Sequence, residues 1–397
     1  MWKFIKYELK YWLGSPMMWV FLFINTALIL GAVSSDNINI GGGVGNVYKN
    51  SPHVVQTYYG VMSLVCLLMT TAFMNATANR DFQYGMYQFV FSSPIKKRDY
   101  FFGKFIGAAI VATIPLLGVS LGSLLGPLMP WADAERYGPV IWEGHLLGFF
   151  GFGLPNVLIS GVLLYGLAVI FRSSIVSFIG AMLILVFYVV SSGFIEDIEK
   201  EWLANALDPF GFRPLELASK YMTVAEKNLN PAPISGAILW NRILWIAISV
   251  VTLLIMYAKF SFAMKKEKSK SAKDISVTPM TKASLWATPV LQHYGFYTGT
   301  FLRMVWFELK SIVRNPTFII LVAIGLINLV ASLTSFTGSY GSKQYPVTYN
   351  VIDTIRGSFY MFLVAIVTFY SGVLVWKERD AKFNEIQDSA PVLTGMI

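Results

Sequence analysis

Charged side chains are scarce in this chain of 397 residues. Asp, Glu, Lys and Arg make up 13% of it, whereas soluble domains carry about 25%. Hydrophobic residues make up 55%, and the mean hydropathy is +0.57. Because so few polar side chains cannot cover a water-soluble fold of this length, most apolar residues must face lipid or one another within lipid. The composition excludes a soluble enzyme and predicts an integral membrane protein.

Histidine and cysteine are scarcer still, and the motifs of catalysis are missing. The three histidines, His53, His145 and His293, lie far apart in the sequence, and no H-E-x-x-H occurs. No G-x-x-x-x-G-K-S/T sequence is present, so this chain cannot hold nucleotide phosphates by itself. The single cysteine, Cys66, permits no intrachain disulfide and is expected to pack within an apolar run. We therefore expect no catalytic residue, no metal and no cofactor in this chain.

Long apolar runs are what the sequence does have. A bilayer core about 30 Å thick needs roughly 20 apolar residues in helical form. Eight stretches of about that length lack Asp, Glu, Lys and Arg, so the sequence predicts an all-α fold, a polytopic transmembrane helix bundle of about 8 spans. They are Met17–Ser34, Val55–Ala78, Phe105–Met129, Leu146–Phe171, Ser173–Ile195, Ile243–Tyr257, Thr317–Thr337 and Gly357–Trp376.

The basic residues lie in clusters that flank these runs. The net charge of +9 therefore indicates membrane lipid around the chain and no nucleic-acid partner. When the N-terminus is placed inside, 22 of the 31 Lys and Arg residues fall in inside loops. This excess predicts a multi-pass protein with a cytoplasmic N-terminus.

The chain repeats itself on the two sides of a basic linker. YELKYWLGSP (Tyr7–Pro16) reappears as FELKSIVRNP (Phe307–Pro316), and the segment Arg80–Ile95 is echoed by Arg379–Val392 at nearly the same offset. Two matches in the same order predict two homologous membrane units. We assign 1–262 to a first six-span unit, 263–298 to a cytoplasmic linker, and 299–397 to the start of a second unit. The repeat predicts that the full reading frame continues beyond Ile397.

Each unit opens with a segment that keeps its cations on one helical face. Such an amphipathic helix is expected to lie in the membrane interface, and Pro16 or Pro316 then marks the turn into the bilayer. A merely basic flank that sets the topology is the alternative. The repetition of Glu8 as Glu308 favours a specific role. The cations are Lys3, Lys6 and Lys10 in the first unit and Arg303, Lys310 and Arg314 in the second.

The inside loop Asn79–Gly107 is too long for a simple connection. Phe82, Met86 and Phe89 alternate with polar residues in it, a pattern that predicts a surface helix ending at Pro94. Such a helix would present a platform to a soluble partner, and a solvated basic loop is the alternative reading. Lys96, Lys97 and Arg98 begin the next segment.

These features carry a family resemblance. The amphipathic N-terminal helix, the Arg-Asp segment that ends in Ser-Pro-Ile, the basic cluster and Gly103-Lys104-Phe105 resemble the membrane subunit of ABC exporters of the ABC-2 class. Four longer strings resemble permeases fused to a C-terminal zinc aminopeptidase-like domain, although Met222 stands where we would expect Trp. The strings are GGGVGN (41–46), LMPWADAERYGP (128–139), LDPFGFRPLELASKYMTVAEKN (207–228) and RGSFYMFLVAIVTFYSGVLVWKERDAKFNEIQDSAPV (356–392).

The resemblance implies a permease driven by a separate ABC ATPase at the cytoplasmic face. ATP and magnesium would bind to that partner, two permease units would pair within the full-length chain, and the location would be the bacterial inner membrane. The outside loop 196–237 would form a small extracytoplasmic helical cap. The residues expected to couple the spans to the ATPase are Glu8, Arg80, Asp81, Phe82, Met86, Tyr87, Phe89, Pro94 and Glu308.

Three other classes of function compare with this one. A membrane anchor that holds an extracytoplasmic peptidase-like domain, with transport lost, is the alternative. A secondary transporter or an intramembrane enzyme is disfavoured, because the expected spans hold no ionisable residue apart from Arg242, which would extend the sixth.

The predicted orientation can be tested with cysteine labelling. A cysteine near Ser271 should be shielded from impermeant thiol reagents in intact cells, because it would lie in the cytoplasm, while one near Ser219 should be labelled. The reverse pattern would overturn the orientation.

Overall fold

The regular elements of the chain are helices. The computed structural model describes residues 1–35, 45–193, 201–262, 294–334, 345 and 347–380, and no strand occurs in these ranges. The helices are α1 (Trp2–Leu13), α2 (Pro16–Ser34), α3 (Pro52–Gln83), α4 (Tyr87–Ser92), α5 (Lys97–Thr113), α6 (Leu117–Leu125), α7 (Trp142–Gly148), α8 (Leu154–Phe171), α9 (Ser174–Gly193), α10 (Glu201–Leu207), α11 (Phe212–Ser219), α12 (Val224–Leu229), α13 (Gly236–Lys259), α14 (Tyr294–Val313), α15 (Pro316–Thr334) and α16 (Thr348–Asp380).

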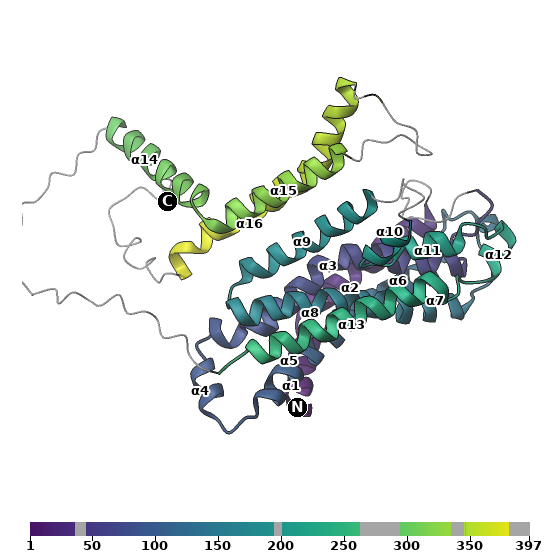
Figure 1. Cartoon of the computed structure of the whole chain (residues 1–397), viewed down its shortest axis with the longest axis horizontal. Coiled ribbons are helices and arrows are strands. Elements are labelled where there is room, and N and C mark those ends of the chain that lie inside the picture. Colours follow the sequence, from purple (N-terminus) through teal and green to yellow (C-terminus); the bar gives the residue numbers. More distant parts are fainter. Residues whose placement is uncertain (36–44, 194–200, 263–293, 335–344, 346, 381–397) are drawn as a thin grey trace, which may run out of the picture. The chain divides into compact units, whose positions relative to one another are not determined.

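The chain forms two compact units. The first unit contains Met1–Phe260 together with Ile324–Phe359, and the second contains Ser261–Ala323 together with Tyr360–Ile397. Within 1–260, α3 packs against α5, α7, α8 and α9, and most of its apolar length is buried. Figure 1 shows α2, α3, α8 and α13 running lengthwise together. The core of the first unit therefore lies around α3.

Six helical segments of the described chain are long and apolar enough to cross a bilayer. A seventh is counted if the bent pair Phe301–Val313 and Pro316–Val330 is one span, with its bend of 63°. The predicted helical membrane protein is confirmed at this level. The count of eight stays a prediction, since the fifth expected stretch falls in α9, whose apolar part Ser174–Val189 is shorter than the others. The six segments are Pro16–Ser34, Pro52–Gln83, Lys97–Leu128, Trp142–Phe171, Gly236–Lys259 and Thr348–Lys377.

The helices extend beyond the apolar runs at one end of the first unit. α3 continues five residues past Ala78 and carries Arg80 and Asp81 in its last turns, and α5 begins at Lys97 instead of Phe105. The expected surface helix is correspondingly shorter than predicted. Gly85, with a φ of +67°, turns the chain after α3, and only the six residues of α4 remain helical before Pro94.

A glycine stripe on α6 and the residue that follows it lets α2 approach closely. Gly118, Gly122 and Gly126 recur every four residues and face α2, the spacing that brings membrane helices into backbone contact. A Cβ atom on Gly122 would lie 2.6 Å from the carbonyl oxygen of Thr26 and 2.8 Å from the amide nitrogen of Leu30. Both are backbone atoms, so no side-chain movement can relieve the contact.

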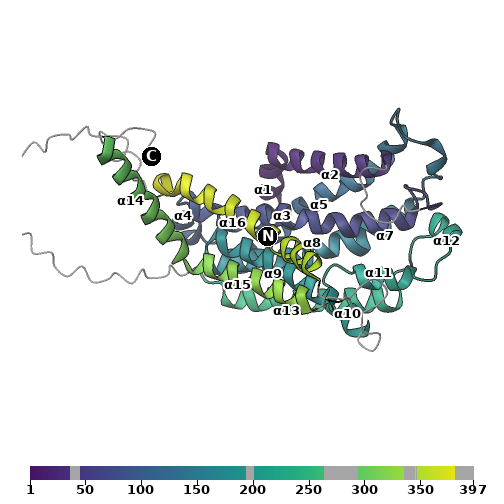
Figure 2. The same cartoon turned by 90° about the horizontal axis from the view of Figure 1, so that it is seen from above.

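Three short helices gather at the end of the first unit away from α4. Figure 2 shows α10, α11 and α12 together at that end. Thr223 begins α12 with a capping box, in which its hydroxyl and the Glu226 carboxylate cap each other's backbone amides. Ser219 in α11 is 7% exposed, so Lys220, which follows it and is exposed, is the better position for the labelling experiment. The native Cys66 is buried and should add no background.

The α2–α6 contact yields a prediction. Gly122→Ala should destabilise the protein by about 1–3 kcal/mol, because the added methyl group meets the α2 backbone. Thermal unfolding in detergent measures the loss. Gly372→Ala is the matched control, since a Cβ there meets nothing within 4 Å. Equal stability of the two variants would contradict the close packing.

Candidate functional site

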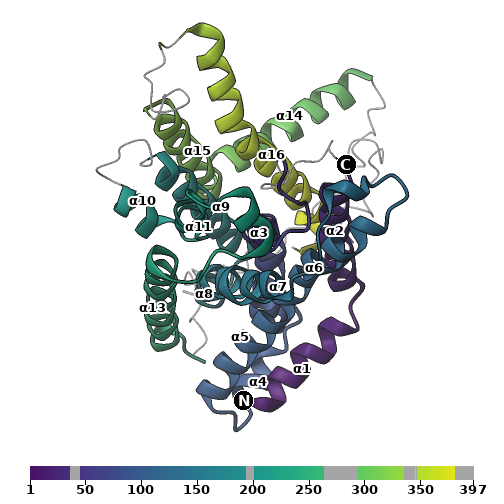
Figure 3. The same ribbon diagram turned by 90° about the vertical axis from the view of Figure 1, so that its right-hand side faces the viewer.

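The opening helix α1 docks through the face that carries its carboxylate. Lys3, Lys6 and Lys10 are exposed, whereas Ile5, Glu8 and Trp12 are buried. The approach to α5 is close, because a Cβ on Gly107 would lie 2.7 Å from the Glu8 Cβ. Figure 3 shows α1 alongside α5 near the N-terminus. The predicted amphipathic pattern is present, but Glu8 points into the bundle and not towards a soluble partner.

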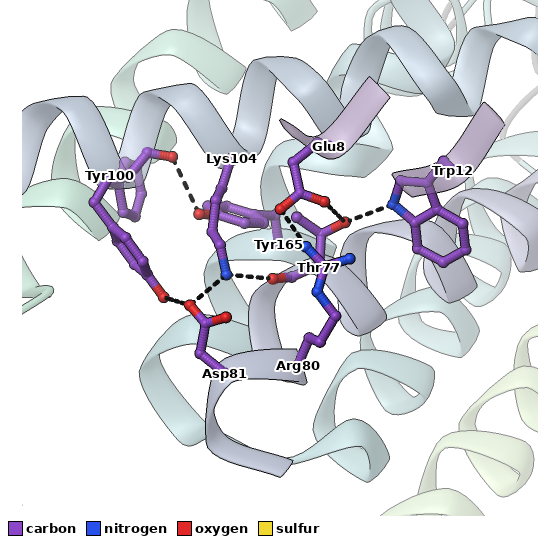
Figure 4. A network of polar contacts seen from close by, with 9 residues as sticks. Glu8, Trp12, Thr77, Arg80, Asp81, Tyr100, Lys104 and Tyr165 are labelled. Atoms are coloured by element: carbon purple, nitrogen blue, oxygen red, sulfur yellow. Dashed lines mark hydrogen bonds and ion pairs between the residues drawn. The ribbon is translucent and has the colours of Figure 1, made fainter. Parts of the chain in front are cut away.

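Glu8 forms a buried ion pair with Arg80 at the end of α3. The Arg80 Nη2 atom donates to Glu8 Oε1 at 2.5 Å, and the two side chains are 7% and 0% exposed. Thr77 donates its hydroxyl to the other Glu8 oxygen at 3.4 Å and accepts from the Trp12 indole at 3.1 Å. Figure 4 shows these contacts joining α1 to α3. Glu8 and Arg80 are both among the residues that the sequence analysis expects to couple the spans to an ATPase. The fold places them in contact with each other.

The Arg80 guanidinium is also held by aromatic rings of α1. Its central carbon lies 4.0 Å from the ring centre of Tyr11 and 5.3 Å from that of Tyr7. Rings at such distances attract a cation through their negative faces. Tyr7, Glu8 and Tyr11 of α1 therefore surround the Arg80 guanidinium of α3. These contacts fix the position of α1 on α3.

A second ion pair joins α3 to α5. Lys104 Nζ donates to Asp81 Oδ2 at 2.6 Å and to the carbonyl oxygen of Thr77 at 3.1 Å. The Tyr100 hydroxyl donates to the same Asp81 oxygen at 2.8 Å (Figure 4). Tyr165 of α8 donates to the carbonyl oxygen of Phe101 nearby, at 3.1 Å. Four helices thus meet around two carboxylates and two cations.

The balance of charge makes this burial tolerable. Burial raises the pKa of the Glu8 carboxyl above its ordinary value, and the neighbouring Arg80 and Lys104 oppose part of that rise. An isolated charge here would be costly, whereas each of these four has a partner of opposite sign. The arrangement holds helices together. Among the described residues, no three His, Cys, Asp or Glu side chains gather as metal ligands would.

Five further predicted residues belong to the hairpin formed by the last turn of α3, the turn at Gly85 and residues 86–94. Phe82 and Tyr87 stack with ring centres 5.3 Å apart and lie beside Phe91, so they form the inner side of the hairpin. Met86 and Phe89 are 50% and 69% exposed, and Pro94 is exposed as well. The hairpin therefore has a packed aromatic side and a free apolar side.

Glu308 forms an ion pair in the second unit. Lys377 Nζ donates to Glu308 Oε2 at 2.6 Å, and both side chains are more than a third exposed. Arg379, which the repeat aligns with Arg80, lies two residues further along α16. In both sequence repeats a carboxylate of the helix before the first span binds a cation near the end of the second span. The described elements α14, α15 and α16 also follow the order of α1, α2 and α3. α15 has the same 19 residues as α2, both helices open with a proline, and α16 has 33 residues where α3 has 32.

Sequence reasoning missed Lys104, Tyr100, Thr77 and Trp12. Lys104 entered the sequence analysis as one of the inside-loop cations and as part of Gly103-Lys104-Phe105, but no partner was predicted for it. The signal that pointed to more was its place between Gly103 and Gly107, a pair of small residues four apart that admits a neighbouring helix. Thr77 gave no signal, because hydroxyls are common in apolar spans.

Searches of protein-family models, curated proteins and solved structures found no match to this chain.

The buried pair yields a prediction on stability. Arg80→Met should cost about 3–5 kcal/mol, because it leaves the Glu8 carboxylate buried without its main partner. The double variant Glu8→Gln with Arg80→Met should recover much of the loss. Thermal unfolding in detergent is the measurement.

Arg213→Met is the matched control for this prediction. Arg213 pairs with Glu216 at the same distance of 2.5 Å, but the Glu216 side chain is 66% exposed. Surface pairs contribute about 0–1 kcal/mol, so this variant should change little. Equal losses for the two arginine variants would contradict the role assigned to burial.

Proposed function

We propose that this chain is a membrane-spanning permease subunit of an ABC-type exporter, driven by a separate ATPase that docks at α4. The chain itself is proposed to be no enzyme, and ATP and magnesium would bind to the partner. The N-terminus and α4 would face the cytoplasm of a bacterium, at its inner membrane, and α10–α12 would form the extracytoplasmic cap. The two units would pair within the full-length chain.

The observation that supports this proposal best is the hairpin of α3 and α4, which has a packed aromatic side and an exposed apolar side. Tyr84, Met86 and Phe89 expose large apolar side chains at the end of the bundle, outside the apolar core of the spans. Apolar side chains grouped in water are typical of a binding surface. A soluble partner on this surface would cover them, which is the platform that the sequence predicts for residues Phe82 to Pro94.

The packed side of the hairpin gives such a partner a route to the spans. Phe91 of α4 contacts Tyr100 of α5, with ring centres 5.7 Å apart, and Tyr100 donates to Asp81 of α3. Phe82 occupies the last turn of α3 itself. Movement of α4 would therefore act on α3 and α5 together, and through Arg80 on α1. A passive anchor needs no such connection.

Purification from native membranes tests the proposal. The wild-type chain should bring down a protein that is photolabelled by an azido-ATP analogue and whose hydrolysis of ATP is sensitive to vanadate. Phe89→Asp should weaken this association by about 30-fold, or about 2 kcal/mol, because it places a charge in the interface.

The control replaces an aromatic residue that is at least as exposed as Phe89 but lies away from α4. Tyr221→Asp changes a side chain that is 84% exposed beside α11 and should leave the association unchanged. The proposal fails if the wild-type chain recovers no ATP-binding protein, or if both variants recover it equally.

A further inference from the structure

Two cavities adjoin along one side of α13. The tail cavity, about 320 Å³, lies between α8, α9 and α13, and its lining includes Val162, Leu163, Leu183, Phe187, Ile248 and Thr252. The head cavity, about 500 Å³, lies beside α10, α11 and the first turns of α13, and its lining includes Trp202, Asn205, Ala206, Trp240, Asn241 and Leu244. They meet where the Trp245 indole donates to the carbonyl oxygen of Ala206 at 3.0 Å.

The two cavities use the same face of α13. Their lining residues on this helix recur at spacings of three and four from Ala237 to Thr252. The opposite face carries Ile243, Ile246 and Val250, which are 50%, 42% and 51% exposed and suit contact with bulk lipid. At a rise of 1.5 Å per residue, the lined stretch is about 22 Å long. One bilayer leaflet with its headgroups is about 20–22 Å thick.

The polarity of the lining also changes along this length. The tail cavity is apolar, and its Ser249 hydroxyl is already bonded to the carbonyl oxygen of Trp245 at 2.8 Å. The lining of the head cavity includes Trp202, Trp240 and Asn205, whose side chains carry hydrogen-bonding groups. Tryptophan prefers the level of the lipid headgroups. The lined stretch therefore runs from hydrocarbon to interface, as one lipid molecule does.

Two charged side chains near the head cavity, Arg242 and Asp208, have their hydrogen-bond partners within the protein. Arg242 donates to the side-chain oxygens of Asn156 and Asn241 and to the carbonyl oxygen of Pro209. Asp208 accepts from the backbone amides of Phe210 and Arg213. Among the residues that the structure describes, no ionised side chain lines either cavity. The site thus favours a head without net charge.

A polypeptide helix does not suit this space. A helix about 10 Å across and 22 Å long would fill roughly 1,700 Å³, well above what the cavities hold. We propose that the tail cavity binds one acyl chain of a zwitterionic membrane phospholipid whose head lies at the head cavity. This inference goes beyond the proposed transport function and is independent of it, since a resident lipid could equally support an anchor.

Photolabelling tests the site. The full chain is reconstituted in phosphatidylcholine vesicles that contain a trace of phosphatidylcholine with a diazirine in its acyl chain, and adducts are mapped after irradiation. Wild-type protein should carry adducts on tail-cavity residues as well as on the outward face of α13. Ser249→Phe should fill the tail cavity and reduce adducts there by at least about fivefold, without reducing those on the outward face.

Val250→Phe is the matched control, with the same new side chain on the opposite face of α13. It should leave tail-cavity adducts unchanged. Equal tail-cavity labelling in the two variants would overturn the proposal. Labelling confined to the outward face in wild-type protein would also overturn it, and is the result expected if a polypeptide segment fills the cavity.

Native mass spectrometry of the wild-type chain supplies a second readout that needs no variant. After extensive washing in detergent, one phospholipid per chain should remain bound. Complete loss of lipid under conditions that keep the chain folded would contradict a built site.

Discussion

The pairing of Glu8 with Arg80 is the constraint on which the end of the first unit depends. Both charges are withdrawn from water, and each is tolerated only because the other is present. The pair can form only if α1 lies across the end of α3, so it fixes the position of a short helix that would otherwise rest on the membrane surface. Thr77, Trp12 and the tyrosines of α1 then complete the contact.

The Glu8–Arg80 pair affects other helices through α3, because α3 is the centre of the bundle. Its last turns carry Arg80 towards α1 and Asp81 towards α5, so both helices are fastened to adjacent residues. The hairpin after α3 adds a layer of aromatic rings between α4 and these ion pairs. The exposed face of α4 is thus one layer of side chains away from a buried charge network. That nearness is the physical basis for the coupling we propose.

The membrane-spanning helices could be predicted from sequence because hydropathy acts locally. Six of the eight apolar stretches coincide, to within one residue at their ends, with parts of segments that are long and apolar enough to span. Pro16 and Pro316 begin α2 and α15 as expected. The helix ends could not be predicted in this way. α3 continues through Arg80 and Asp81 because partners 72 and 23 residues away neutralise them, and no local pattern reveals such partners.

The candidate site was predictable only in part for the same reason. Glu8 stood out because it recurs as Glu308 within a basic helix, and Arg80 and Asp81 stood out because the pair recurs. The sequence pattern did not show where these side chains point, since a carboxylate in a cationic helix can face either water or the bundle. Gly107 allows Glu8 to face the bundle, because its missing side chain leaves room for the Glu8 side chain. The length of α4 was overestimated because Gly85 takes a positive φ that periodicity does not register.

Hydrogen exchange of the α1 amides would test most directly whether the buried pair holds this helix in place. In lipid nanodiscs, the wild-type α1 amides should exchange slowly, and Glu8→Gln should speed their exchange by at least about tenfold, since it leaves Arg80 without its carboxylate. Lys6→Gln, on the exposed face of the same helix, should leave the rate unchanged. Equal exchange in all three proteins would contradict the account, because α1 would then be held by the membrane surface alone.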